Sequence, residues 1–155
     1  MTFADGSVAF TSVKIGDQVW MSKNLAIDDD GEGIYYNPKN KEYYYTWAAA
    51  VRIAKAIPGW HLPSVDEWDE ACEECGGVKT ESDDYEECSL KQKLKIKPSG
   101  RYKDNFNYVD SYSYFWSASE VSKHCACCRV FNTDSVGRYS IIKARGYSVR
   151  LVKDK

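Results

Sequence analysis

The sequence predicts a single α+β domain in which two helices are packed on short, mostly antiparallel strands. Two stretches with helical periodicity in the first half, and short alternating segments on both sides of them, indicate this class. The length of 155 residues suits one domain with its own core, and aromatic residues make up 14% of the chain. We therefore expect residues 1–155 to fold as one unit.

The N-terminal segment, residues 8–25, is expected to form two strands joined by a turn. Residues 13–15 alternate between apolar and polar side chains, Gly16 and Asp17 supply the turn, and a second apolar run follows. Residues 28–42 are rich in Asp, Gly and Asn, and we expect a loop there.

The first helix is expected to begin after Thr46, whose hydroxyl can accept a hydrogen bond from a free N–H group of the first turn. It should run to about residue 57, because Pro58 and Gly59 then stop it. Its apolar residues share one face: Trp47, Ala50, Val51, Ala54 and Ile57.

The second helix is expected to begin after Ser64, which stands three residues before Glu67 as in a capping box. A Gly-Gly pair at residues 76–77 ends it. Its apolar face contains Val65, Trp68, Ala71, Cys72 and Cys75. Because Cys72 and Cys75 lie on that face and not at a helix N-terminus, we interpret them as core thiols rather than a redox or zinc pair.

The second half of the chain is expected to consist of strands, because no helical period survives after residue 88. Residues 115–119 have the pattern of a core strand, and residues 146–152 that of a final strand. Polar and aromatic side chains alternate over residues 108–114. The sequence shows no internal repeat.

Catalytic motifs are missing from the sequence, which has no glycine-rich phosphate loop, no nucleophile elbow and no His-Glu-x-x-His pair. One of the two His, His61, lies in a connector flanked by Pro, and we expect it to be structural. The formal net charge of −2 gives no reason to expect nucleic acid or an anionic membrane as a partner. We therefore expect neither enzyme activity nor a cofactor.

No apolar run approaches the length of a membrane span, and residues 1–17 lack the apolar region of a signal peptide. The chain as given would therefore stay in the cytoplasm, leave by a route that its own sequence does not encode, or have lost a leader. The six Cys lack the spacing of a disulfide framework, and we expect them to be reduced.

A cluster of one His and three Cys occupies five positions: His124, Cys125, Cys127 and Cys128. Such soft ligands could hold zinc or copper(I), or supply a reactive thiol. On a strand, however, Cys125 and Cys127 would share one face and Cys128 would lie on the other, and no second pair is placed to complete a site. A metal-binding or thiol enzyme site at residues 124–128 is therefore the alternative, and a patch of free thiols is preferred.

Five motifs follow one another along the chain. They are residues 13–25 (Val-Lys-Ile-Gly-Asp-Gln-Val-Trp-Met-Ser-Lys-Asn-Leu), 45–50 (Tyr-Thr-Trp-Ala-Ala-Ala), 58–64 (Pro-Gly-Trp-His-Leu-Pro-Ser) with Glu67 and Trp68, 115–120 (Phe-Trp-Ser-Ala-Ser-Glu) and 146–152 (Gly-Tyr-Ser-Val-Arg-Leu-Val). Together they resemble the Fibrobacter succinogenes major paralogous domain, in the right order and over nearly the whole chain.

This resemblance implies a C-type-lectin-like fold, in which the first and last strands pair, two helices pack on the sheet and a loop-rich face binds ligand. The calcium and sugar motifs of true lectins (Glu-Pro-Asn and Trp-Asn-Asp) are absent, so calcium-dependent sugar binding is not implied. Formylglycine-generating enzymes share the broad fold, but their catalytic thiols have no counterpart with supporting motifs here.

Domains of this kind also resemble the variable proteins of diversity-generating retroelements, in which adenines of a template are mutated at random. Codons AAC and AAT treated in this way cannot reach Glu, Gln, Met, Trp or Lys. Residues 121–145 contain no Glu, Gln, Met or Trp, where the rest of the chain predicts roughly three or four. Lys123 and Lys143 would have to be fixed template positions. This interpretation implies a phage or prophage origin.

The resemblance thus predicts a receptor-recognition protein with a hypervariable ligand-binding surface at residues 121–145, for a protein or glycan on a cell surface. The expected contact residues are Val121, His124, Cys125, Cys127, Cys128, Asn132, Asp134, Arg138, Tyr139, Ile141, Ile142 and Arg145. Tyr139, Arg145 and His124 would be anchors of the contact. A structural module of a surface assembly, with an apolar contact between copies, is a further alternative.

Overall fold

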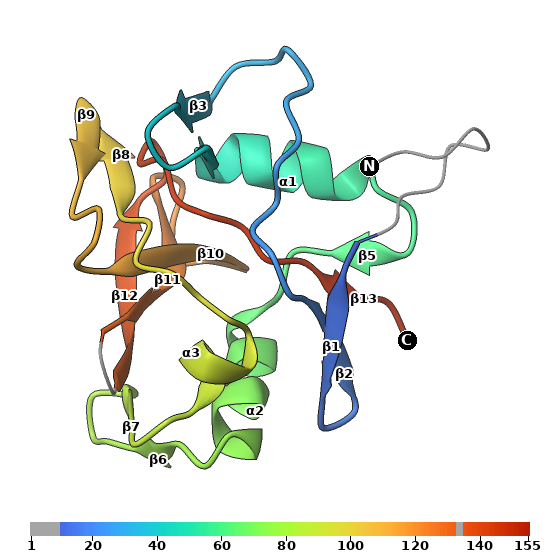
Figure 1. Ribbon diagram of the computed structural model, residues 1–155, viewed down its shortest axis with the longest axis vertical. Helices are drawn as coiled ribbons and strands as arrows, with labels where there is room; N and C mark the ends of the chain where they lie inside the picture. The colour runs from blue at the N-terminus through green and yellow to red at the C-terminus, as the bar shows by residue number, and fades with distance from the viewer. Residues whose placement is uncertain (1–9, 133–134) are drawn as a thin grey trace.

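The computed structural model describes residues 10–132 and 135–155 and shows a mixed α+β fold (Figure 1). Within these residues the helices are α1 Trp47–Lys55, α2 Val65–Glu74 and the short α3 Leu90–Lys93. The strands are β1 Ser12–Ile15, β2 Gln18–Met21, β3 Ile34–Asn37, β4 Glu42–Tyr45, β5 Trp60–His61, β6 Val78–Lys79, β7 Tyr85–Glu86, β8 Arg101–Lys103, β9 Asn105–Asn107, β10 Ser113–Glu120, β11 Cys125–Phe131, β12 Ser135–Ile142 and β13 Val152–Lys153. The predicted α+β class is confirmed.

Two antiparallel sheets organise the chain. One has the strand order β1-β2-β13-β5, so that the N-terminal hairpin pairs with the C-terminal strand through Trp20 and Val152. The other has the order β10-β11-β12-β7-β6, and β3–β4 and β8–β9 form two further pairs. In Figure 1 the two sheets lie on opposite sides of the view, with α1 above and α2 below. The expected pairing between the two ends of the chain is therefore present.

Both predicted helices begin where their caps were expected. Thr46 Oγ1 accepts a hydrogen bond from the Ala49 backbone N–H at 3.3 Å, and α1 follows. Ser64 and Glu67 form a reciprocal capping box at the start of α2, with N–O distances of 3.1 and 3.0 Å. A cap of this kind stabilises a helix by about 1 kcal/mol. Cys72 is buried on α2, as expected for a core thiol, whereas Cys75 is the C-cap residue that follows the helix and is only half-buried.

Two elements depart from the sequence prediction because distant contacts hold them. Residues 28–42 contain β3 and the start of β4 instead of a continuous loop, and Tyr35 of β3 stacks on Tyr102 of β8 with 3.9 Å between ring centroids. The helix α3 lies in the half of the chain where we expected strands only. Its buried Leu90, together with Leu94, holds it against the core.

The predicted final strand is divided among several neighbours. Only its last residue, Val152, belongs to β13, whereas Tyr147 bridges to Tyr45 of β4 and Ser148 bridges to Phe115 of β10. All residues from 146 to 152 are buried. Residues 146–152 therefore cross the interior and contact β4, β10 and β2 in turn.

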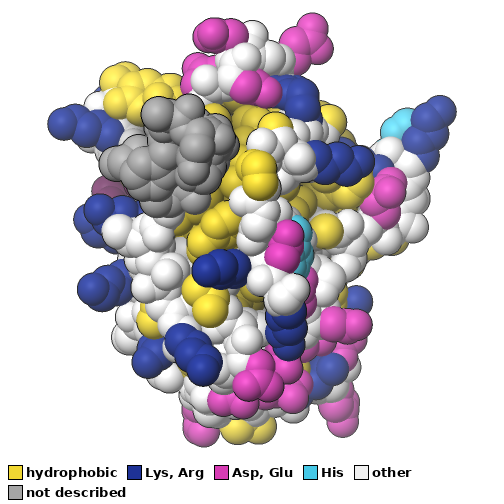
Figure 2. Space-filling model, turned by 90° about the vertical axis from the view of Figure 1, so that its right-hand side faces the viewer, with side chains coloured by type: hydrophobic (Ala, Val, Ile, Leu, Met, Phe, Trp, Pro, Cys, Tyr) yellow, Lys and Arg dark blue, Asp and Glu magenta, His cyan; other side chains and the backbone are white. Residues whose placement is uncertain are grey.

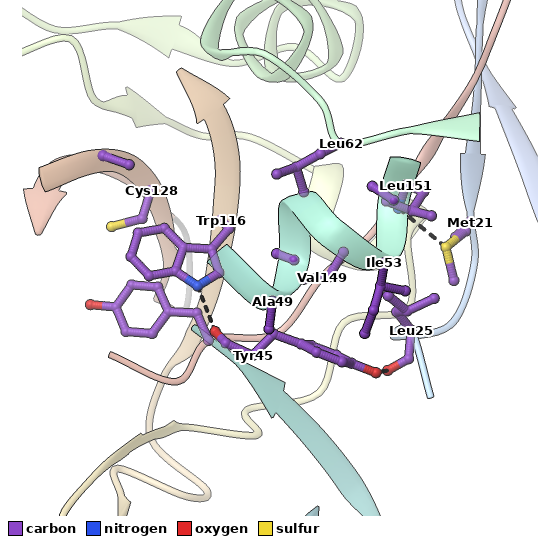
Figure 3. Close-up of a cluster of buried hydrophobic side chains, with 14 of the residues drawn as sticks. Met21, Leu25, Tyr45, Ala49, Ile53, Leu62, Trp116, Cys128, Val149 and Leu151 are labelled. Atoms are coloured by element: carbon purple, nitrogen blue, oxygen red, sulfur yellow. Dashed lines mark hydrogen bonds between the residues drawn. The ribbon is translucent and has the colours of Figure 1, made fainter. Parts of the chain in front are cut away.

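The larger core cluster lies between α1 and the strands β4 and β10 (Figure 3). The indole of Trp116 is fully buried, and its N–H donates to the Tyr45 carbonyl oxygen at 2.7 Å. The Tyr45 hydroxyl in turn donates to the Ile27 carbonyl oxygen at 2.8 Å. Removing such a buried indole typically costs about 3–5 kcal/mol. The aromatic residues of the predicted motifs thus form the centre of the fold.

A buried guanidinium joins this core to the second one. Arg150 is 2% exposed and donates to Asn24 Oδ1 at 2.6 Å and to the carbonyl oxygens of Met21 and Leu94 at 3.1 and 2.8 Å. Burial lowers the pKa of Arg150 to about 10. These bonds satisfy a charge that would otherwise be costly to bury, so Arg150 is a structural residue of the final segment.

Candidate ligand-binding surface

The predicted contact segment forms the central hairpin of the five-stranded sheet. Strand β11 pairs with β12 in antiparallel register, so that Cys128 lies opposite Tyr139 and Arg129 lies opposite Arg138. Because side chains alternate along a strand, the hairpin has two faces. One face, here called the cleft face, carries Ala126, Cys128, Val130, Gly137, Tyr139 and Ile141. The opposite face, here called the helix face, includes Cys127, Arg129, Phe131, Val136 and Arg138.

The predicted contact residues differ widely in exposure. Exposed side chains are Val121, His124, Asn132, Tyr139 and Ile142; half-buried ones are Cys125, Arg138, Ile141 and Arg145; buried ones are Cys127 and Cys128. The largest exposed apolar groups are Val121 at 55%, Tyr139 at 56% and Ile142 at 46%. Asp134 lies outside the described residues.

Burial removes Cys127 and Cys128 from the surface that a ligand can touch. Cys128 is 1% exposed, lies beside Trp116 in the core (Figure 3) and has its pKa raised to about 12 by burial. Cys127 is 6% exposed, and its carbonyl oxygen accepts a hydrogen bond from the Ser117 hydroxyl at 2.7 Å. A central strand is covered on both faces, which is the physical reason that a Cys-rich run belongs to the interior here.

The thiols of residues 124–128 do not converge. Cys127 points to the helix face and Cys128 to the cleft face, while His124 lies in the exposed bend before β11. Among the residues that the structure describes, no group of three His, Cys, Asp or Glu side chains could hold a metal ion. The His-Cys cluster is therefore a consequence of sequence order and not a shared site in space.

Arg129 is an interior residue of the hairpin that the sequence reasoning missed. Its guanidinium is buried, forms an ion pair with Asp69 of α2 and donates to the Asp83 carbonyl oxygen at 3.2 Å. It also lies 5.7 Å from the centre of the Tyr85 ring. The helix face of the hairpin is therefore locked to α2 and to β7. A lone Arg inside a run of small and apolar residues was the only local signal for this role.

A cleft of about 410 Å³ opens on the cleft face of the hairpin. It is lined by Asp84, Arg101, Tyr112, Tyr114, Val130, Asn132, Ser135, Gly137, Tyr139, Ser140, Ile141 and Tyr147. Three of the predicted contact residues, Asn132, Tyr139 and Ile141, meet here. Its volume lies within the range typical of small-ligand sites, about 300–1,000 Å³.

The walls of the cleft come from segments far from the hairpin, which the sequence reasoning did not place. Arg101 comes from β8, Tyr114 from β10 and Tyr147 from the buried final segment. The alternation of polar and aromatic side chains over residues 108–114 was a visible signal for one of these walls. Nothing local indicated that Arg101 would stand beside it.

Tyr139 lies flat along its own strand. A Cβ atom at Gly137 would come within 2.7 Å of Cε2 of the Tyr139 ring, and all three of its nearest contacts belong to that ring or its hydroxyl. The ring thus occupies the space above Gly137, two residues earlier on the same face. Gly137 is therefore required for the position of Tyr139 and not for an unusual backbone angle.

Arg101 gives the cleft its positive charge. Its guanidinium carbon lies 5.1 Å from the centre of the Tyr108 ring and 5.4 Å from that of Tyr114, in cation–π contact with both. No carboxylate of the described residues forms an ion pair with it, and its buried Nε atom has no hydrogen-bond partner among them. Among the described residues, Asp84 is the one carboxylate that lines the cleft, and it accepts a hydrogen bond from the Arg138 backbone N–H at 2.9 Å.

The far end of the hairpin is held by Lys143. Its ammonium group donates to Glu120 Oε2 at 2.6 Å and lies 4.4 Å from the centre of the Trp47 ring of α1. Its backbone N–H donates to the His124 carbonyl oxygen at 2.8 Å. Lys143 therefore fixes the bend that carries Val121 and His124.

A second, apolar groove of about 520 Å³ lies away from the hairpin strands, and Figure 2 shows hydrophobic side chains gathered on that side of the molecule. Its lining includes Trp47, Val51, Trp60 and Leu62, with His61 at its rim. The imidazole of His61 bridges Asp154 at 2.6 Å and Glu67 at 2.7 Å. His61 thus joins β5, the start of α2 and the C-terminal end, in agreement with the structural role expected for it.

The chain belongs to the family of the Fibrobacter succinogenes major domain (Fib_succ_major), which residues 13–153 match. No curated protein and no solved structure matches the chain. Among the described residues, no helix is long and apolar enough to cross a membrane.

Proposed function

We propose that this domain is a ligand-binding, receptor-recognition protein whose contact surface is the β11–β12 hairpin, carried on a C-type-lectin-like scaffold. The observation that supports this most is the division of the hairpin between its two faces. The helix face is fixed to α2 through the buried Arg129, whereas the cleft face and the bend expose Tyr139, Val121 and His124. A rigid support with exposed aromatic and apolar groups suits a contact surface.

The lectin-like part of the proposal is supported by the arrangement of the elements. The N-terminal hairpin pairs with β13, and α1 and α2 lie against the strands. These are the features that the family resemblance implies for such a fold. No sugar-binding calcium motif accompanies them in the sequence.

Diversification by a retroelement is supported by where the residues of the segment lie. Adenine mutation of codons AAC and AAT cannot create a Lys, so Lys143 would be a fixed position. Lys143 makes an ion pair with Glu120 and a cation–π contact with Trp47, which gives a structural reason for keeping it fixed. The segment's exposed side chains include Tyr139 on the cleft face, Ser140 and Ile142 on the same face as Cys127, and Val121 and His124 in the bend. We propose a protein or glycan on a cell surface as the partner, with the domain displayed on a phage particle.

The test is to sequence the DNA around the gene and search for a near-copy of the codons for residues 116–152. A repeat that differs almost only at adenines, beside a reverse transcriptase gene, is the expected result. The differing codons should include those for Tyr139 and Asn132 and exclude those for Arg129 and Lys143. If no such repeat exists, or if it differs at the codon for Arg129, diversification of this surface is refuted.

A further inference from the structure

We propose that the cleft face binds an acidic monosaccharide unit, a pyranose that carries a carboxylate, in the glycan that this domain recognises. This inference deepens the proposed function, because it assigns a chemical class to the ligand of the same surface. Three features of the cleft support it: a cation that has no ion-pair partner among the described residues, a wall of tyrosines, and several lining side chains that carry hydroxyl groups.

The cation calls for an anionic ligand group. Arg101 stands at the wall of the cleft between two tyrosine rings, without an ion-pair partner among the described residues and with its Nε atom buried and unbonded. A planar guanidinium matches a carboxylate in shape and can bind it through two parallel hydrogen bonds. The contacts with Tyr108 and Tyr114 hold the Arg101 side chain in place before a ligand binds. Binding therefore costs Arg101 little side-chain conformational entropy.

The rest of the lining calls for a ligand with several hydroxyl groups. Besides Arg101 and Asp84, the lining of the cleft includes four tyrosines and two serines, whose side chains carry hydroxyl groups. Each tyrosine or serine hydroxyl both donates and accepts hydrogen bonds, as the hydroxyls of a sugar do. The carboxylate of an acidic peptide side chain would use Arg101 but leave most of these groups to water.

The shape of the cleft agrees with a single ring or two linked rings. Its volume of about 410 Å³ is larger than one amino-acid side chain needs. The ring of Tyr139, laid flat over Gly137 and 56% exposed, offers an apolar surface to the C–H face of a pyranose. The cleft thus combines a flat aromatic floor with polar walls and one positive charge.

The experiment is a two-dimensional NMR titration of the intact domain with the methyl glycosides of glucuronic acid, galacturonic acid and N-acetylneuraminic acid. Methyl glucoside is the neutral control, and acetyl-glutamate amide supplies a carboxylate without a sugar. Saturable shifts of the amide signals of Gly137, Tyr139 and Tyr114 with at least one acidic sugar are expected. The neutral sugar and the glutamate derivative should bind at least about tenfold more weakly, because each lacks half of the matching groups.

Arg101→Met keeps an apolar stem over the tyrosines and removes the guanidinium, with its charge and its hydrogen-bond donors. It should weaken binding of the acidic sugar by about 10–100-fold, whereas Lys103→Met, which removes a charge from the same strand outside this cleft, should change it by less than about twofold. Melting curves of both variants establish that they are folded.

Four results would overturn the inference: no saturable shift with any of the three acidic sugars, equal binding of the neutral sugar, equal loss in both variants, or tighter binding of the glutamate derivative. The last would assign the cleft to an acidic protein segment. None of these results affects the search for a near-copy of the codons for residues 116–152. Failure of the acidic-sugar proposal and failure of the retroelement proposal are therefore distinguishable.

Discussion

Arg129→Met tests whether the buried Arg129 fixes the helix face of the hairpin to α2. The substitution keeps most of the apolar volume of the side chain, so it creates little cavity. It removes the ion pair with Asp69 and the hydrogen bond to the Asp83 carbonyl oxygen, and it leaves the Asp69 carboxylate, whose side chain is 16% exposed, without its cation. Breaking a buried pair in this way costs about 3–5 kcal/mol.

We expect a loss near the lower end of that range, about 3 kcal/mol, because water can still reach part of Asp69. Such a loss is a large fraction of the stability of an ordinary domain, about 5–15 kcal/mol. Equilibrium urea unfolding, followed by tryptophan fluorescence, measures it directly. The slope of the unfolding free energy against urea should stay unchanged if the native structure is retained.

Arg138→Met is the matched control, since Arg138 lies directly opposite Arg129 in the register. Its side chain is 34% exposed, and its guanidinium lies 3.7 Å from the Asp83 carboxylate, so the pair is weak and the expected loss is below about 1 kcal/mol. A loss below about 1 kcal/mol for Arg129→Met, or equal losses for the two variants, would refute the reasoning.

Three further predictions concern other parts of the molecule. Gly137→Ala should change the unfolding free energy by less than about 1 kcal/mol but displace the Tyr139 ring. NMR contacts between the ring and residue 137 would reveal the displacement. A loss above about 2 kcal/mol would mean that the backbone, and not the ring, is displaced. Partial burial lowers the pKa of His61, but the hydrogen bonds to Asp154 and Glu67 outweigh this effect, so that the pKa is raised. The stability that protonated His61 provides is therefore complete below about pH 6.5. It is lost as pH rises through the raised pKa. Urea unfolding between pH 5 and pH 9 should show that loss in the wild type and in His124→Gln but not in His61→Gln, and a dependence unchanged in His61→Gln would contradict it. Iodoacetamide should label the half-buried Cys75 and Cys125 in the native protein, while Cys72 and Cys128 react only after unfolding; mass spectrometry locates the labels, and early labelling of Cys128 would place it outside the core.

The helices could be predicted from the sequence because their signals are local. The capping box of Ser64 and Glu67, the cap at Thr46 and the apolar stripes all lie within a few residues of the features they specify. The same holds for the turn at Gly16, which joins β1 and β2. Family motifs then gave the order of the remaining elements, since each supplies buried aromatic residues of the core.

The cleft could be predicted only in part, because its walls come from distant segments. Asn132, Tyr139 and Ile141 were identified from their place in the unusual segment, but Arg101 becomes a wall residue only through its packing on Tyr114. The error at Cys127 and Cys128 has a related cause. Alternation along a strand says which side chains share a face, but it does not say that neighbouring elements cover both faces.

A hairpin that is anchored to the core and also carries exposed side chains is a suitable place for a changeable surface. The interactions of Arg129 and Phe131 with α2 and the second core hold the strands whatever lies on the exposed side. A substitution at Tyr139 changes a side chain that is 56% exposed, and changes of surface side chains usually alter stability by less than about 0.5 kcal/mol. The walls supplied by Arg101 and Tyr147 lie outside the segment, so they would stay constant while the floor varied. A ligand charge held by Arg101 would then be common to all variants, and the hairpin would select among ligands that carry it.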